Sequence, residues 1–443
     1  MKKNITLLLF VFLIGLYSEN ATAQKKEINL SDLDKKQVID SLSKKLEEFY
    51  IRPKTIGEIS KKLNENLKKG NYKNILLPNE FASKLSADLI EASKDLHFRV
   101  MYEPAWAESQ QKIKEKETQE KIKATELIEA KKKNFGFMQA RILEGNIGYL
   151  EFNYFEDPAI ASETAASLMQ FLNNTDALLI DLRKNNGGAM EMGQFISSYF
   201  FSNKELPLYK YYYFEENRKK VEREMWLLPS VPGKRLDAVP IYILTSGGTF
   251  SAAEWMSYSL QNLKRVTIVG EKTAGGAHPI TRTVLANGFS VNIPFGEVKD
   301  PITNNDFEGK GVMPDVLCKS EEAISTAHLL ALKNVSEQNK DNANDLNWFV
   351  PVVKNRQKPF VIDSTLLKSY EGKFGKSELV FENNNLYFRW NNIITLLLTP
   401  LESDLFIVDG TDDYRIKIVF ENNTVTAIKR IYRDGQERIY KKD

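Results

Sequence analysis

ALLIDLRKNNGG, residues 177–188, is the stretch that decides the fold, because a continuous apolar run passes directly into a polar loop that ends in two glycines. Such a run is typical of a strand that is buried on both faces of a parallel sheet. Strand-like and helix-like segments alternate around it between residues 136 and 316. This alternation predicts an α/β fold.

The two glycines, Gly187 and Gly188, allow a close approach of the backbone to another segment. One of their amides could donate a hydrogen bond to a developing oxyanion. The alternative interpretation is a strand-to-helix turn that requires positive φ angles. The loop lacks the GxxxxGK[ST] pattern of a phosphate-binding loop.

Segments of different composition flank this region and divide the chain. Three amphipathic helical patterns predict a small helical bundle over residues 24–107, and a segment rich in Lys, Glu and Gln predicts a charged helical arm over 108–135. The α/β core is expected over 136–335. A polar linker over 336–362 leads to a small all-β domain over 363–443, which is predicted from β-branched and aromatic runs between Asn and Gly turns.

The charge balance and the scarcity of cysteine and histidine exclude several classes of protein. The 443 residues include 61 Lys and Arg and 59 Asp and Glu, so the net charge of +2 leaves no basic excess for a nucleic-acid backbone. The single cysteine excludes a disulfide within the chain and a cysteine-rich zinc site. The three histidines are too scattered to propose a histidine-built metal cluster.

The first 23 residues have the pattern of an export signal. Lys2 and Lys3 precede an apolar run over 5–17, and Ala21-Thr22-Ala23 provides a small-x-small cleavage site. The apolar run is shorter than the ~20 residues that span a bilayer. We therefore expect a signal peptide over residues 1–23 and a periplasmic or secreted protein of bacterial type, without a stable membrane anchor after cleavage. The alternative interpretation is a short N-terminal anchor.

The segment TFSAAE, residues 249–254, follows a glycine-containing turn and opens a predicted helix. A serine at the start of a helix lies beside unpaired backbone N–H groups and the positive end of the helix dipole. The Ser251 hydroxyl could attack a carbonyl carbon while the Ala252 amide stabilises the oxyanion that forms. The alternative interpretation is that Ser251 only caps the helix.

Two further segments carry groups that could assist such a serine. His97, in DLHFRV at residues 95–100, titrates near neutrality and is the natural general base for a serine. Glu308, in EGKGVMPD at residues 308–315, could orient the imidazole ring. Both segments also have structural interpretations, since a lone histidine is often structural and Gly and Pro are typical of surface loops.

The segments DLRxNxGG, TFSAAE and ExxGVxPD, in this order, resemble the tail-specific, or C-terminal-processing, serine peptidase family. The helical N-terminal segment that ends in DLHFRV is similar to the branch related to interphotoreceptor retinoid-binding protein and the tricorn core protease. The resemblance covers most of residues 30–320. It implies a crotonase-like α/β core that is preceded by a helical bundle.

The resemblance also implies a role for each matching residue. Ser251 matches the nucleophile, His97 the general base, and Glu308 the acidic residue that supports the catalytic group. The oxyanion hole is matched by the amides of Ala252 and Gly188, with Gly187 as the alternative to Gly188. The resemblance implies no metal and no organic cofactor.

The sequence departs from the family pattern at two positions. Gly276 stands where the Ser–Lys members carry a lysine, which disfavours a Ser–Lys dyad and leaves His97 as the base. Leu96 stands where tricorn-like members carry a serine, so the orientation of the imidazole must come from Glu308 or from the backbone. The chain between His97 and Gly136 is also too short for the PDZ domain of many relatives.

These features predict an exported serine peptidase that hydrolyses peptide or protein substrates through an acyl-enzyme intermediate, with a Ser-His(-Glu) catalytic arrangement. Two other functions stay open on the sequence alone. The same scaffold could carry apolar ligands without catalysis, as retinoid-binding relatives do. The same serine could also serve an esterase or another hydrolase.

Overall fold

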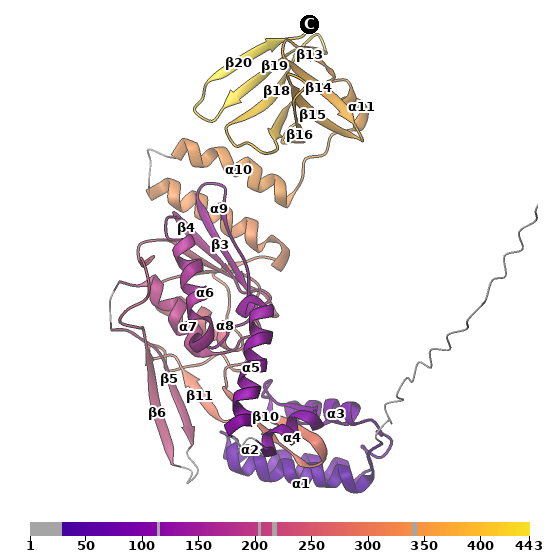
Figure 1. Ribbon diagram of the computed structural model, residues 1–443, viewed down its shortest axis with the longest axis vertical. Coiled ribbons are helices and arrows are strands. Elements are labelled where there is room, and N and C mark those ends of the chain that lie inside the picture. Colours follow the sequence, from indigo (N-terminus) through magenta and orange to yellow (C-terminus); the bar gives the residue numbers. More distant parts are fainter. Residues whose placement is uncertain (1–28, 113–115, 203–204, 215–218, 339–342) are drawn as a thin grey trace, which may run out of the picture.

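The computed structural model describes residues 29–112, 116–202, 205–214, 219–338 and 343–443. Over these residues the molecule is elongated, with an α/β core between a helical unit at one end and a β domain at the other (Figure 1). The predicted signal peptide, residues 1–23, lies outside the described residues. Among the helices that are described, none combines the length and the apolar character needed to span a bilayer.

The core contains a mixed sheet that has six strands in the described part of the chain, in the order β12-β8-β7-β4-β3-β2. The first five run parallel, and β2 is antiparallel at one edge. The predicted buried strand is β4, at the centre, and all of its residues are buried. The strands are β2 (Phe137–Leu143), β3 (Ile147–Phe152), β4 (Ala177–Asp181), β7 (Ile241–Thr245), β8 (Thr267–Gly270) and β12 (Val316–Leu317).

Helices cover both faces of this sheet. Successive side chains of a strand point to opposite sides, so each buried strand contributes to the core on both faces. Leu178 and Ile180 of β4 face a hydrophobic core that they share with the first group of helices, whereas Leu179 faces a second core. The first group is α6 (Pro158–Phe171), α7 (Met190–Ser197) and α8 (Ala252–Asn262), and the second is α9 (Ala323–Gln338) and α10 (Ala343–Gln357). The α/β class predicted from the sequence is confirmed.

The N-terminal unit combines three helices with strands that come from much later in the chain. The helices α1 (Asp32–Phe49), α2 (Pro53–Lys68) and α3 (Pro78–Ser93) lie where the apolar periodicity predicts them. Their core also contains Leu285, Phe289, Val291 and Ile293. These residues belong to or flank an antiparallel sheet of β1 (Arg99–Tyr102), β10 (Phe289–Pro294) and β9 (Ile280–Val284). The helices therefore share their core with a segment nearly 200 residues away, which the sequence did not predict.

Further elements border the core. The charged segment forms α4 (Pro104–Lys112) and α5 (Lys116–Lys132), and α5 runs from the helical unit toward the central sheet (Figure 1). Strands β5 (Pro207–Phe214) and β6 (Lys220–Trp226) pair with each other, and β11 (Gly296–Lys299) extends this sheet beside β5. The short 3₁₀ helices are η1 (Asn134–Gly136), η2 (Ser198–Phe200), η3 (Ala286–Gly288) and η4 (Ser320–Glu322).

The C-terminal residues form the all-β domain that the sequence predicts. After α11 (Ser364–Lys368), the strands follow one another in an antiparallel sheet from β13 to β20. The Asp443 amide donates to the Lys373 carbonyl at 2.9 Å, so the end of the chain returns to the first strand. The strands are β13 (Gly372–Phe374), β14 (Ser377–Glu382), β15 (Asn385–Trp390), β16 (Ile394–Pro400), β17 (Leu405–Val408), β18 (Tyr414–Glu421), β19 (Thr424–Tyr432) and β20 (Glu437–Lys441).

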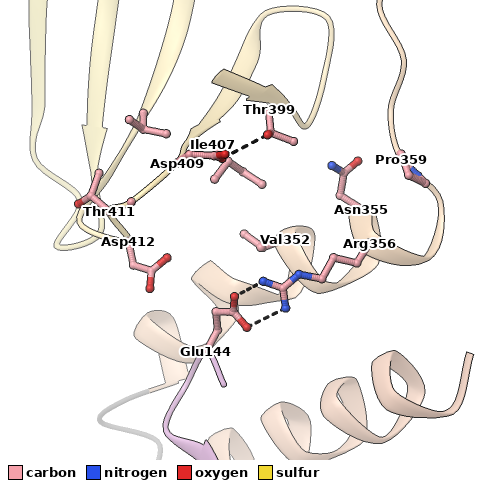
Figure 2. A pocket seen from close by; sticks show the side chains of 12 residues that line it. Glu144, Val352, Asn355, Arg356, Pro359, Thr399, Ile407, Asp409, Thr411 and Asp412 are labelled. Atoms are coloured by element: carbon pink, nitrogen blue, oxygen red, sulfur yellow. Dashed lines mark hydrogen bonds and ion pairs between the residues drawn. The ribbon is translucent and has the colours of Figure 1, made fainter. Parts of the chain in front are cut away.

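The linker predicted over 336–362 is wrong for much of its length, because α10 occupies residues 343–357. Its apolar residues Leu346, Phe349 and Val353 lie at helical spacing and are buried in the core shared with α9. Polar residues at both ends of the helix, and Pro351 within it, make this segment resemble a linker in the sequence. Near the C-terminal end of α10, Arg356 forms a two-bonded ion pair with Glu144, beside a pocket of about 600 Å³ next to the β domain (Figure 2).

The strands of the N-terminal unit should carry much of its stability. Phe289→Ala is expected to lower the free energy of unfolding by about 3–5 kcal/mol, because it leaves a cavity at a fully buried ring that contacts Phe81 and Tyr102. Urea denaturation followed by circular dichroism measures the loss. The control is Ile302→Ala, at a side chain that is 59% exposed. Equal stability of the two variants would show that the helices do not depend on the strands.

Candidate active site

Two loops at the carboxyl ends of β4 and β7 are tied together by hydrogen bonds. The two strands are parallel neighbours, so both loops leave the sheet at the same edge. Thr249 Oγ1 donates to the Leu182 carbonyl at 2.8 Å, and the Phe250 amide donates to the Asn185 carbonyl at 3.0 Å. These bonds hold the serine segment 249–254 against the glycine pair at the end of the first loop.

Ser251 is the N-cap residue of α8 and has an unusual backbone conformation, with φ of 56° and ψ of −121°. A residue other than glycine at positive φ costs about 1–3 kcal/mol and persists where its surroundings hold it in place. The Ser251 amide donates to the Glu254 carboxylate at 3.0 Å. Strain of this kind is often found at functional sites, and here it falls on the predicted nucleophile.

Glu254 is the fully buried carboxylate that holds this conformation. Besides the Ser251 amide it accepts hydrogen bonds from the amides of Gly275 and Gly276, at 2.7 and 2.8 Å, and from the Thr273 hydroxyl. Burial raises the pKa of Glu254, although these donors oppose the rise. The carboxylate thereby ties the serine loop to the loop at residues 273–276.

The two amides that the sequence assigns to an oxyanion hole are free to donate. The Gly187 amide is occupied, since it donates to Asn185 Oδ1 at 2.9 Å. In the part of the chain that the structure describes, the amides of Gly188 and Ala252 donate to no other group. The loops are in contact here, because a Cβ on Gly187 would lie 3.1 Å from the Ala252 nitrogen. Gly188 rather than Gly187 is therefore the glycine whose amide can serve an oxyanion.

His97 reaches the site from the N-terminal unit, between α3 and β1. Its ring packs on the ring of Phe250, the neighbour of Ser251, with the centroids 4.6 Å apart. The residue is 7% exposed, and neither ring nitrogen has a hydrogen-bond partner among the described residues. No hydrogen bond joins His97 to Ser251 in this structure. Such bonds often tighten only when substrate is bound.

Gly276, which stands where the Ser–Lys members carry a lysine, lies against the rings of Phe250 and His97. A Cβ on Gly276 would come within 2.1 Å of the Phe250 ring and 2.8 Å of His97 Cε1. A lysine side chain therefore cannot occupy position 276 while Phe250 and His97 pack as they do. Lys272, the other cation in this run, has an exposed side chain.

Asp95 is the described carboxylate that lies nearest to the His97 ring, and sequence reasoning missed it. Asp95 Oδ1 lies 3.6 Å from His97 Nδ1 and accepts the His97 amide at 3.1 Å. Burial raises the pKa of Asp95, but its contacts with His278 and His97 lower it by more, so the net pKa is well below its usual range. The position of Asp95, two residues before His97, is the feature of the sequence from which this role could have been predicted.

Glu308, which the sequence assigns to the orientation of the imidazole, lies in the same cluster. Its Oε2 accepts the Ala277 amide at 2.6 Å and lies 3.7 Å from His278 Nδ1, and burial raises the pKa of Glu308. Its Oε1 is buried and has no hydrogen-bond partner among the described residues. Asp95, His97 and Glu308 each offer a ligand atom within 4.8 Å of the others, so this is also the group of described residues that could hold a metal ion.

Two family models match this chain. Residues 146–318 match the model of peptidase family S41, and residues 18–135 match the model of the N-terminal domain of Peptidase S41 in eukaryotic IRBP. The chain therefore belongs to peptidase family S41, with the IRBP type of N-terminal domain, as the sequence motifs predict.

Individual relatives share part of the chain. A carboxyl-terminal-processing protease of Synechocystis sp. is 26% identical over 44% of this chain and 42% of its own length. A solved lipoprotein of Streptococcus agalactiae is 16% identical, with a TM-score of 0.45 over 68% of this chain and 97% of that chain. The tricorn protease is 21% identical, with a TM-score of 0.30 over 44% and 18% of the two chains. The chain spans about two fifths of the length of curated relatives such as the Synechocystis protease.

The role of Glu254 in holding the strained serine can be tested directly. Glu254→Gln replaces one acceptor oxygen by an NH₂ group that faces other donors. We therefore expect the free energy of unfolding to fall by about 2–4 kcal/mol. Chemical denaturation measures this loss. The matched control is Ser257→Ala on the same helix, where a buried hydroxyl donates to one helix carbonyl. A Gln variant as stable as this control would show that the carboxylate is not needed to organise the loops.

Proposed function

We propose that this protein is a serine peptidase in which Ser251 attacks the scissile carbonyl and forms an acyl-enzyme intermediate. The observation that carries the proposal is the strained N-cap conformation of Ser251 beside two amides, of Ala252 and Gly188, that are free to donate. Donors held in place before charge develops stabilise the tetrahedral intermediate more than water can. Membership of family S41 supports the same chemistry.

His97 would take the proton from Ser251 and deliver it to the leaving amine. Its Nδ1 side faces the ionised Asp95, which stabilises the imidazolium that forms. Its Nε2 is buried and unpartnered among the described residues, so it is available to the serine. A water activated by the same histidine would then hydrolyse the acyl-enzyme.

A polypeptide is the substrate class that the surface next to the site favours. A groove of about 1,430 Å³ runs between α5 and the β3–α6 loop and reaches Lys184 and Asn186, immediately before the glycine pair. It is lined by Met138, Tyr154 and Ile160, which are 56%, 44% and 39% exposed. An open groove of this size can hold several residues of an extended chain.

Carriage of an apolar ligand finds less support. The apolar pocket beside Ala252, which Met190, Leu208 and Trp255 help to line, leaves only about 10 Å³ of free space. A ligand of retinoid size would need several hundred Å³. We also propose that the protein acts outside the cytoplasm after removal of residues 1–23, on the strength of the N-terminal pattern alone.

Fluorophosphonate labelling read by intact mass tests the catalytic assignment. We expect the wild-type protein to gain one label, and the Ser251→Ala and His97→Ala variants to gain none, because the label requires an activated serine. Protein expressed with its natural N-terminus in a bacterial host should also have the mass of a chain that starts at Gln24. Labelling that survives in His97→Ala would move the base role elsewhere. A folded wild-type protein that never labels would overturn the peptidase proposal.

The groove can be tested separately from the chemistry. Ile160→Glu should raise KM for an unfolded protein substrate about tenfold, because it places a charge where an apolar side chain would be buried. The rate of fluorophosphonate labelling should not change. Ile302→Glu, at an exposed isoleucine that does not line the groove, is the matched control. An equal KM in the two variants would show that substrate does not use this surface.

A further inference from the structure

Asp95 stands between two histidines from distant parts of the chain. Its Oδ2 lies 2.6 Å from His278 Nδ1, and its Oδ1 lies 3.6 Å from His97 Nδ1. The three residues are 0%, 1% and 7% exposed. A carboxylate that is held at one oxygen presents the other in a fixed direction. The contact of Oδ2 with His278, together with the His97 amide that donates to Oδ1, therefore fixes how Asp95 faces the His97 ring.

Arg52, the N-cap residue of α2, determines where the proton of His278 lies in this arrangement. Arg52 Nη2 is 3.2 Å from His278 Nε2, and a guanidinium group can only donate hydrogen bonds. His278 Nε2 must therefore accept, which leaves the ring proton on Nδ1. From there it is donated to Asp95. Arg52 is oriented in turn by Glu297, at 4.0 Å.

The remaining charged and titratable groups around this pair are few. Glu308 Oε2 lies 3.7 Å from His278 Nδ1. Tyr50, at the end of α1, lies close enough that burial and then the charge of Asp95 raise the pKa of its hydroxyl. Glu308 cannot replace His278 as the donor to Asp95 Oδ2, because its carboxylate is an acceptor when ionised and already receives the Ala277 amide.

We propose that His278 is a positioning residue for the base: it clamps Asp95 Oδ2 so that Asp95 Oδ1 faces His97 Nδ1 and His97 Nε2 is directed toward Ser251. The inference rests on the proposed function, which makes His97 the base. His278 acts through Asp95 and supplies the orientation that is otherwise left open by Leu96. The Leu96 side chain cannot supply it, since it is apolar and 42% exposed.

The test compares two substitutions of His278 that differ in one donor. His278→Leu removes the donor to Asp95, and we expect kcat for a small ester to fall about a hundredfold with KM unchanged, as for a misplaced catalytic group. His278→Asn keeps an N–H near the position of Nδ1 and should retain kcat within about tenfold of wild type. His328→Leu is the matched control, because His328 is equally buried but bonds only the Glu144 carbonyl. Equal losses in the Leu and Asn variants of His278 would overturn the proposal.

A measurement that needs no turnover separates this proposal from the proposed function. In a Ser251→Ala background, the ring tautomer of His97 is read from its ¹⁵N NMR shifts, and we expect His278→Leu to lower the fraction of rings with the proton on Nδ1, because Asp95 Oδ1 is no longer held beside that atom. An unchanged tautomer overturns the positioning role. A wild-type protein without turnover would overturn the peptidase proposal and leave this comparison intact.

A second variant keeps the test valid if His278→Leu does not fold. Arg52→Met, at a side chain that is 34% exposed, frees His278 Nε2 and allows the ring proton to move away from Asp95. We expect kcat to fall about tenfold with an unchanged melting temperature. An unchanged kcat in this variant would contradict the proposal.

Discussion

The buried Glu254 carboxylate is the interaction on which the candidate site depends. Removing a charged carboxylate from water costs several kcal/mol unless donors surround it. Here the donors are three backbone amides and one hydroxyl, and each comes from a loop whose position matters for the chemistry. The desolvation cost is offset only when all of these loops are in place. The carboxylate therefore couples the strained conformation of Ser251 to the position of the loop at residues 273–276.

The second constraint is the way in which the N-terminal unit is built. Its helices bury their apolar faces partly against Phe289 and Val291, which the chain reaches only after it has completed most of the α/β core. The unit is tied to the core through strands β9 and β10, because these strands follow His278 directly in the chain. His97 lies in the short connection between α3 and β1, and β1 pairs with β10. The packing of an otherwise separate helical unit thus sets the position of the proposed base.

The elements and the candidate residues differ in how far they could be predicted from the sequence. Strand β4 and the three N-terminal helices follow from local apolar patterns, and Ser251 and His97 follow from motifs. The contact between Asp95 and His278 joins residues 183 positions apart, and no local pattern reports a contact at that separation. The sequence prediction missed helix α10 for a different reason: Asn, Asp and Lys flank its apolar residues, so the segment resembles a polar linker. The choice between Gly187 and Gly188 depends on the hydrogen bond that the Gly187 amide donates to Asn185 Oδ1, which only the folded structure reveals.

The short segment 275–278 connects the cluster around Ser251 with the cluster around His97. Gly275 and Gly276 donate their amides to Glu254, the Ala277 amide donates to Glu308, and the His278 ring donates to Asp95. Four consecutive residues thus contact the carboxylate that holds Ser251 and the two carboxylates that surround His97. The glycines are required because a Cβ at Gly275 would collide with the loop that carries Glu308, and one at Gly276 would collide with Phe250. A segment this short has little freedom to stretch, so a shift of either cluster is transmitted to the other. In a fold assembled from distant segments, it fixes the geometry between serine and histidine.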